Sequence, residues 1–176
     1  ALKIHGVNAR TMREIQALGF DDLSADDAVT FRIHGIDADF VEEMEGLGFR
    51  DLDIDQLVAL RVHDINARFM GRMKALGFDN LSADRAIALK VHDINERFVQ
   101  EMRDLGMADL TPVRLIAMKI LEVDEDFVEE MRSRRYEDVS VRELLRRKGH
   151  RWYYNNYNTE YLDAMEDLVR ELTRDR

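Results

Sequence analysis

The 176-residue sequence has no cysteine, a single proline and no long apolar run, and each absence excludes a class of structure. Without cysteine the chain forms neither a disulfide framework nor a thiolate metal site, but this composition fits a reducing and an oxidising compartment equally well. Charged residues interrupt every apolar stretch well short of the roughly 20 residues that cross a bilayer. We therefore expect no membrane-spanning segment, and the compartment stays open.

Strand signals and catalytic motifs are also missing from the sequence. The period-two alternation of a half-buried strand is absent. So are a Gly-rich phosphate loop, a Gly-x-Ser-x-Gly motif and paired carboxylates at a recognisable spacing. These absences predict an all-α protein that is not an enzyme and that needs no cofactor.

Charge is abundant and unevenly distributed: 26 Lys and Arg stand against 36 Asp and Glu, for a net charge of −10. Residues 1–131 hold 15 basic and 27 acidic residues, whereas residues 132–151 hold 8 basic and 3 acidic ones. Because phosphate contacts supply most nucleic-acid affinity and need a basic face, the acidic body disfavours general nucleic-acid binding. Only the basic block keeps that alternative open.

The sequence repeats with a period of 29 residues, and a histidine begins each of four copies: His5, His34, His63 and His92. A fifth, diverged copy begins at Leu121. Residues 1–4 match the end of a preceding copy and the chain does not begin with Met, so we expect it to be part of a longer protein. We assign residues 1–150 to this helical repeat array and residues 151–176 to an aromatic segment followed by a capping helix.

Each copy is predicted to fold as two short helices. The first helix follows an N-cap residue type, whose side-chain oxygen accepts a backbone N–H; these residues are Asn8, Asp37, Asn66, Asn95 and Asp124. In the third copy, an apolar helical face is formed by Phe69, Met70, Met73 and Leu76, and Gly77 follows as a left-handed C-cap. The methionine column that includes Met73 is expected in the core.

The second helix follows another set of cap residues: Ser24, Asp53, Ser82, Thr111 and Ser140. Pro112, the only proline, falls at the first helical position, where its missing N–H and fixed φ are tolerated. In the third copy we expect this helix to bury Ala86, Ile87, Leu89 and Val91.

Helices of about ten residues are marginal alone because nucleation is unfavourable, so the helix pairs must stack. The predicted fold is an α-solenoid of about five two-helix copies, of either hand. In the fifth copy Arg134, Arg135 and Arg147 replace a leucine, a glycine and an apolar core residue. We predict that this copy, together with an amphipathic helix over residues 159–174, caps the C-terminal end of the array.

The segments H-G-V-N-A-R-T-M-R-E-I-Q-A-L-G-F and D-L-S-A-D-D-A-V resemble a bacterial helical repeat. That repeat is found in tandem toward the C-terminus of membrane metallopeptidases of the beta-lactam-sensor antirepressor type. The resemblance covers residues 1–148, but Asn-Ala, Asp-Ala or Asn-Glu stands where the family has Thr-Pro, and the zinc motif His-Glu-x-x-His is absent. The resemblance therefore implies an accessory array of a bacterial protein, to which no catalytic residue carries over.

The histidine column raises the alternative of a metal-dependent hydrolase that uses the pairs His63–Asp64 and His92–Asp93. Equivalent residues of stacked copies lie about 8–10 Å apart, whereas each ligand of one zinc lies about 2.1 Å from it. The histidines therefore share no metal, and two copies carry Gly6 and Gly35 in place of the aspartates. We favour a structural role, in which the ring covers a turn and Gly or Asp ends the helix.

Two charged columns are nearly constant among the copies. The basic column ends each second helix, where a cation offsets the helix dipole: Lys3, Arg32, Arg61, Lys90, Lys119 and Lys148. The acidic column precedes each second helix: Asp22, Asp51, Asn80, Asp109 and Asp138. We favour cap and dipole roles for both, with a Lys/Arg ladder that holds an acidic partner as the alternative.

Other columns vary from copy to copy, and a solenoid usually carries its specificity in such columns. They are Arg10, Asp39, Arg68 and Arg97, and Gln16, Glu45, Lys74 and Arg103. Both sets become basic along the array, which favours an oriented, charged partner if one set lies on a concave surface.

The segment over residues 146–158 combines four basic residues with the only tryptophan and three tyrosines. Its candidate contacts are Arg146, Arg147, Lys148, Arg151, Trp152, Tyr153, Tyr154 and Tyr157. This mixture suits a peptide groove, nucleic-acid stacking or anionic lipid, while the aromatic residues can equally pack beneath the capping helix. We predict a non-enzymatic scaffold that binds a protein or peptide through these residues, Arg68 and Arg97. The alternative is nucleic-acid or anionic-surface binding through residues 142–157.

Overall fold

The computed structural model describes residues 7–17, 19–20, 24–133, 140–141, 143–145 and 147–148 of the chain. All regular secondary structure in these residues is α-helical, as predicted. None of the helices in this part of the chain has the length and apolar character to cross a membrane. The helices are α1 (Ala9–Gln16), α2 (Ala25–His34), α3 (Ala38–Gly46), α4 (Ile54–Val62), α5 (Ala67–Ala75), α6 (Ala83–Val91), α7 (Glu96–Asp104), α8 (Pro112–Ile120) and α9 (Glu125–Ser133).

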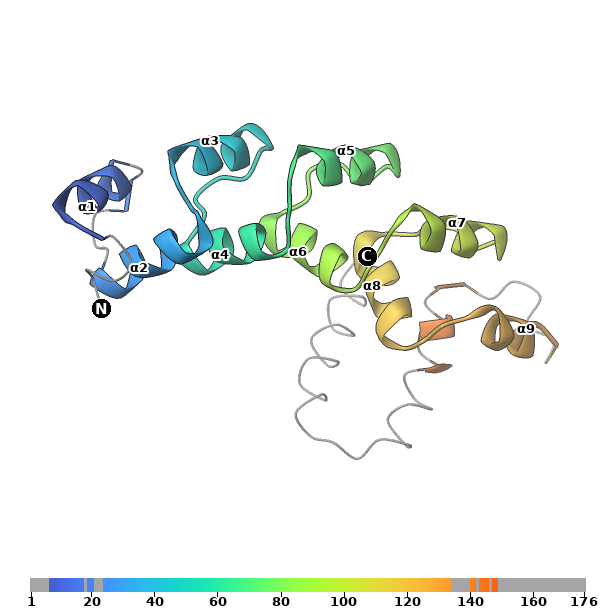
Figure 1. The fold of residues 1–176 in the computed structure, drawn as a ribbon. Helices are drawn as coiled ribbons and strands as arrows, with labels where there is room; N and C mark the ends of the chain where they lie inside the picture. The colour runs from blue at the N-terminus through green and yellow to red at the C-terminus, as the bar shows by residue number, and fades with distance from the viewer. Residues whose placement is uncertain are drawn as a thin grey trace, which may run out of the picture. The chain divides into compact units, whose positions relative to one another are not determined.

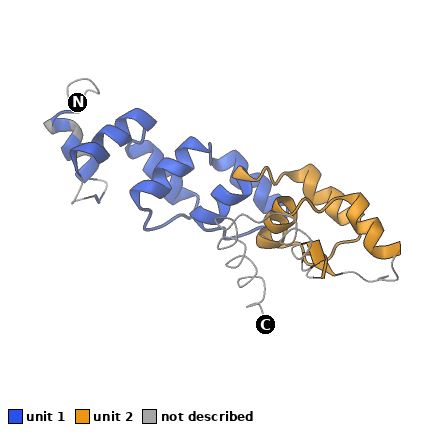
Figure 2. Cartoon of the chain, turned by 90° about the horizontal axis from the view of Figure 1, so that it is seen from below, with its two compact units in different colours: residues 1–90 blue, residues 91–176 orange. Residues whose placement is uncertain are grey.

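The helices alternate between the first and the second position of successive copies (Figure 1). They group into two compact units: unit 1, residues 1–90, and unit 2, residues 91–176, which contains α7, α8 and α9 (Figure 2). Within unit 1, α1, α3 and α5 lie in one row and α2, α4 and α6 in another, and α2 packs against α1 and α4. Short helices that are marginal alone are thus stabilised by their neighbours.

Side-chain caps begin the first helices of the copies at the predicted positions. In four copies the cap Oδ1 accepts from the backbone N–H three residues later at 2.9–3.0 Å; the caps are Asp37, Asn66, Asn95 and Asp124. In the first copy Asn8 Oδ1 accepts from the N–H of Arg10 at 2.8 Å. The predicted cap column is therefore confirmed where the structure describes it.

The second helices begin at their predicted caps as well. Their side-chain oxygens accept from backbone N–H groups at Ser24, Asp53, Ser82 and Thr111. Pro112 is at the first position of α8, as expected. Ser24 also donates to the carboxylate of Asp27 from its hydroxyl and its backbone N–H, and these hydrogen bonds lower the pKa of Asp27.

The core is formed by one apolar column from the first helices and one from the second. The first-helix column is buried at Ile15, Met44, Met73, Met102 and Met131, which confirms the methionine column as core. The second-helix column has 0% exposure at Phe31, Leu60, Leu89 and Met118. Burial of each such side chain contributes about 1.5–3 kcal/mol, so these two columns hold each helix pair together.

The prediction that Val91 lies in the core is wrong. Val91 is 52% exposed, and its counterparts Val62 and Ile33 are 56% and 59% exposed. Two residues advance about 200° around a helix, so Val91 lies on the side opposite to the fully buried Leu89. Ile87 is half-buried. The buried face of the second helices is therefore narrower than the sequence suggests.

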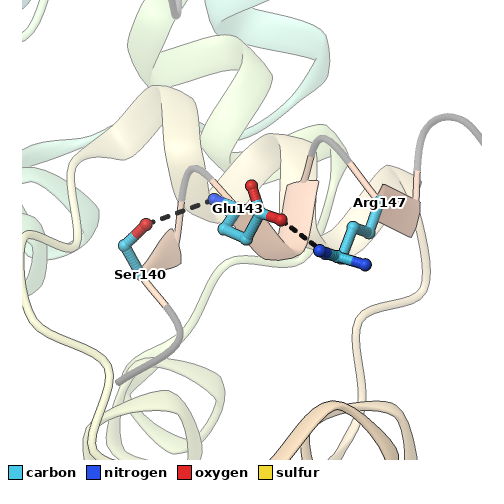
Figure 3. A network of polar contacts seen from close by, with 3 residues as sticks. All are labelled: Ser140, Glu143 and Arg147. Atoms are coloured by element: carbon cyan, nitrogen blue, oxygen red, sulfur yellow. Dashed lines mark hydrogen bonds and ion pairs between the residues drawn. The ribbon is translucent and has the colours of Figure 1, made fainter. Parts of the chain in front are cut away.

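The fifth copy departs from this core pattern. Ser140 caps its second helix by accepting from the backbone N–H of Glu143 at 3.3 Å, and the Glu143 carboxylate forms an ion pair with Arg147 (Figure 3). Arg147 thus places a half-buried ion pair where the other copies bury an apolar side chain. The rest of the predicted cap lies outside the described residues: Arg134, Arg135, residues 159–174 and the boundary at residue 150.

Candidate binding cleft

The basic column of the repeat stacks on aromatic rings. In four copies the cation that ends the second helix lies over the phenylalanine ring of the same copy's first helix. The distances to the ring centroid are 4.9 Å for Arg61 and Phe40, 5.3 Å for Lys90 and Phe69, 4.3 Å for Lys119 and Phe98, and 4.5 Å for Lys148 and Phe127. Such contacts are attractive because the ring face is electronegative. They account for a cation at this position without an external acidic partner.

The acidic column forms left-handed turns and does not cap the helices. The φ angles of Asp51, Asn80 and Asp109 are 52°, 57° and 56°. Asn and Asp adopt this conformation more readily than other residues with a side chain, which explains the residue types. The predicted cap role is wrong, because the capping side chains stand two residues later in the sequence.

The residue after the histidine position is also left-handed in the four copies where the structure describes it, as the Gly/Asp alternation predicts; in the fifth copy this residue is Glu122, which follows Leu121. The φ angles are 63° at Gly35, 52° at Asp64, 50° at Asp93 and 52° at Glu122. Each of these residues follows the end of a second helix. This column is therefore set by the backbone, and glycine fits it without strain.

The histidines lie beside these turns and are half-buried at His34, His63 and His92. The carboxylate of Asp64 accepts a hydrogen bond from the side-chain amide of Asn66 at 3.0 Å, within the turn that follows His63. Among the described residues no group of three or more His, Asp and Glu side chains is arranged to hold a metal ion. The hydrolase alternative therefore gains no support from the geometry.

The predicted partner-binding residues that the structure describes come from three copies of the repeat. Arg147 and Lys148 are engaged in the ion pair and the ring contact given above. Arg68 is exposed in unit 1, and Arg97 is exposed in unit 2, where its Nε lies 3.5 Å from Glu101 Oε1. The others lie outside the described residues: Arg146, Arg151, Trp152, Tyr153, Tyr154 and Tyr157.

Both variable columns of the repeat lie at the surface. All of their members are exposed: Arg10, Asp39, Arg68, Arg97, Gln16, Glu45, Lys74 and Arg103. Because the core uses none of these side chains, their identity can change from copy to copy without loss of packing.

A cleft in unit 2 combines an apolar floor with a rim of carboxylates. It has a volume of about 650 Å³ and is lined by residues of α7, the C-terminal end of α8 and the start of α9. The floor is formed by Phe98, Met102, Leu105, Met118 and Val123. The rim is formed by five exposed residues: Glu101, Asp104, Glu122, Asp124 and Glu125. Lys119 is the only cation among the lining residues, and it lies over the Phe98 ring.

Local contacts orient several rim carboxylates without burying them. Asp124 caps α9 by accepting from a backbone N–H at 2.9 Å. Asp104 Oδ1 accepts from the side-chain amide of Gln100 at 2.8 Å. Glu101 pairs with Arg97, and the two side chains are 53% and 83% exposed. Exposed pairs of this kind contribute little stability, so the carboxylates remain accessible to a partner.

Helix ends add to the negative potential of the rim. Asp104 is the last residue of α7, and Glu122 follows the C-terminal end of α8. A helix C-terminus carries about half a negative charge. The end of α8 reinforces the neighbouring carboxylates, whereas at the end of α7 Arg132 Nη2 donates to the backbone carbonyl of Leu105 and offsets part of that charge. The positive N-terminus of α9 is offset by Asp124 and Glu125. The cleft therefore favours a cationic ligand.

The rim residues are not evident from a single copy of the sequence, because they come from two successive copies. Glu101 and Asp104 belong to the fourth copy, whereas Glu122, Asp124 and Glu125 belong to the fifth. The corresponding residues in unit 1 are Glu43, Gly46, Asp64, Asn66 and Ala67. Taking these columns together across a copy boundary reveals five carboxylates in one place and two in the other.

No protein-family model matches the chain, and no curated protein or solved structure matches it either. The resemblance to a metallopeptidase-associated repeat therefore stays a prediction. The function is inferred from the division between fixed and variable positions and from the cleft of unit 2.

Proposed function

We propose that the chain is a non-enzymatic protein-interaction module that serves as the repeat region of a larger bacterial protein. The observation that carries this proposal is the division between fixed and variable positions. The fixed columns have structural tasks: they are buried in the core, cap helices, form left-handed turns or stack on phenylalanine rings. The variable columns are exposed, so they are available to a partner.

The cleft of unit 2 supports the same proposal. Interfaces combine an apolar centre with a polar rim, and this cleft has an apolar floor and an exposed charged rim. The floor residues belong to the core columns, whereas three of the five rim carboxylates, Asp104, Asp124 and Glu125, have uncharged counterparts in unit 1. The buried floor residues thus hold in place exposed rim residues whose identity the fold does not require.

A peptide-display selection on the whole chain tests this proposal. We expect enriched peptides that bind the folded chain with a dissociation constant of about 10 μM or below, as is common for short peptide ligands. The matched control is the Leu89→Asp variant, which places a charge at a fully buried position and unfolds the array. Failure to enrich any peptide that distinguishes the folded chain from this control would contradict the proposal.

The nucleic-acid alternative is tested in the same preparation. Of its basic residues, Arg147 is ion-paired and Lys148 lies over a phenylalanine ring, so no observation among the described residues favours it. Binding to DNA, RNA and anionic vesicles is measured at about 50 mM salt and above, since phosphate contacts weaken steeply with salt. Strong, salt-dependent binding to any of them would replace our proposal with this alternative.

A further inference from the structure

We propose that the cleft of unit 2 binds a basic segment of a partner protein, with an apolar side chain on the floor and Lys or Arg side chains along the rim. This inference rests on the proposed function and names the class of partner. It is carried by three properties of the cleft: its charge, its floor and its size.

The negative charge of the cleft favours a cationic ligand. Five exposed carboxylates surround it, and the single lining cation, Lys119, lies over the Phe98 ring. The C-terminal end of α8 adds negative potential at Glu122, while the end of α7 is bound by Arg132 through the Leu105 carbonyl. Nucleic acid and anionic lipid are repelled by such a rim, whereas Lys and Arg side chains neutralise it.

The apolar floor of the cleft favours a ligand that carries an apolar group beside its Lys or Arg side chains. Phe98 and Met102 are only 6% and 3% exposed, so they already belong to the core and form a preformed surface. The half-buried Leu105 lies beside Met102 in the cleft. Methionine is polarisable and adapts to the shape of a neighbouring side chain. When an apolar side chain of the partner lies on this floor, its apolar surface is removed from water, which contributes affinity.

The cleft is large enough for several side chains, and among the described residues its carboxylates do not converge on a metal ion. A volume of about 650 Å³ lies within the range of pockets that enclose small organic ligands or several side chains, about 300–1,000 Å³. Ca²⁺ needs oxygen ligands that converge to about 2.3–2.6 Å, and among the described residues no group of three or more acidic or histidine side chains converges in this way. A segment of polypeptide that carries both charge and an apolar anchor satisfies floor and rim together.

The matched positions of unit 1 show that the fold does not require the acidic rim. The floor is preserved there as Phe40, Met44, Leu47, Leu60 and Ile65, but the rim has two carboxylates in place of five. Because helix pairs form in both units, the additional carboxylates are not needed for folding. They are free to serve recognition of a basic segment.

The test is isothermal titration of the full chain with the peptide Lys-Arg-Leu-Lys-Arg-Lys-Leu-Arg-Lys. Two further peptides isolate the contributions: one replaces each leucine by serine, and the other replaces each Lys or Arg by Glu. The rim variant combines Glu101→Gln, Glu122→Gln and Glu125→Gln, and leaves Asp124 in place because it caps α9. The control variant combines Glu42→Gln, Asp55→Asn and Asp79→Asn, which make the same charge change at exposed positions of unit 1 outside the variable columns.

We expect the basic peptide to bind the wild-type chain and the control variant equally. Each exposed ion pair changes affinity about two- to threefold, so the rim variant should bind about tenfold more weakly. The serine peptide should lose at least as much, and the Glu peptide should not bind.

Three outcomes overturn the inference. The basic peptide fails to bind; it binds the rim and control variants with the same affinity, as a diffuse attraction to an acidic chain predicts; or the serine peptide binds as tightly as the leucine peptide. The proposed function survives these outcomes if display selection yields peptides whose binding is unchanged in the rim variant. It fails only if selection yields none.

Discussion

The cleft of unit 2 and the corresponding surface of unit 1 share a framework but differ in charge. Phe98 and Met102 have the counterparts Phe40 and Met44, and all four side chains are buried. In each unit a cation from the second helix lies over that phenylalanine ring. The rims differ: five acidic residues in unit 2 correspond to Glu43, Gly46, Asp64, Asn66 and Ala67 in unit 1.

This difference separates the requirements of the fold from those of recognition. Residues that both units share are explained by packing, capping and left-handed turns. The acidic residues that unit 2 has and unit 1 lacks lie on the exposed rim, where substitution has little effect on stability. The comparison therefore predicts that changes to the framework act equally on both units, whereas changes to the rim act on binding in one.

The largest effect is expected for the shared floor. Met44→Ala and Met102→Ala each remove a side chain that is 0% or 3% exposed, and each should lower stability by about 2–5 kcal/mol. Denaturant unfolding, followed by circular dichroism, measures both. A loss at Met102 that is far smaller than the loss at Met44 would mean that the floor of the cleft is not part of the core.

A smaller difference is expected between the two stacked cations. Arg61 lies over the Phe40 ring and also donates a hydrogen bond from Nε to the backbone carbonyl of His34 at 3.2 Å. For Lys119 the contact is that with the Phe98 ring. Arg61→Met should therefore cost about 1.5 kcal/mol and Lys119→Met about 0.5 kcal/mol. Thermal unfolding of both variants measures the two losses of stability. Equal losses would mean that the hydrogen bond from Arg61 contributes nothing.

The next prediction concerns a variant in which unit 1 receives the acidic rim residues of unit 2. Gly46→Asp, Asn66→Asp and Ala67→Glu, combined in one variant, give unit 1 the acidic residues of unit 2 at two exposed positions and at the half-buried cap position 66. No atom lies within 4 Å of a Cβ added at Gly46, and aspartate caps helices as well as asparagine does. We expect the basic peptide to gain a second site whose affinity is about tenfold above the background in unit 1, or about 1.4 kcal/mol.

Titration calorimetry measures the number of bound peptides, which should rise from one to two per chain. The control variant combines Gly46→Asn and Ala67→Gln and keeps Asn66, since these changes alter size without adding charge. An unchanged stoichiometry would show that the rim charge does not suffice for binding on this framework.

The smallest effect is expected at the left-handed turns. Glu122 and Asp64 have the same φ of 52°, but a left-handed residue is strained by about 1–2 kcal/mol unless it is glycine or a short polar residue. Glu122→Gly should therefore raise stability by about 1 kcal/mol, and Asp64→Gly by a few tenths at most. Equal responses in denaturant unfolding would contradict this account of the column.

The sequence predicts much of the framework because its signals are local and recur in every copy. Asn66 and Ser82 are read as caps from residue type and position, and Pro112 and Gly77 mark a start and an end that the structure confirms. Met73 is read as core from helical spacing. Each of these assignments needs only the residue and its neighbours in the chain.

The remaining features depend on contacts between segments, which one copy does not reveal. Val91 was expected in the core because it is apolar, but its angle around α6 places it outside. Lys119 stacks on Phe98, which precedes it in the chain by most of a copy. The cleft of unit 2 joins the end of α7 to residues beyond α8, so its charge emerges only when two copies are taken together.

The most direct test of the central claim is a titration of the isotope-labelled chain with the basic peptide, followed by backbone amide chemical shifts. The account predicts that the shifts concentrate at residues 98–105 and 118–125, which line the cleft, and that residues 40–47 and 60–67 of unit 1 stay unchanged. Shifts of similar size in both sets of residues would contradict it, because they would show that the shared framework, and not the rim of unit 2, determines binding.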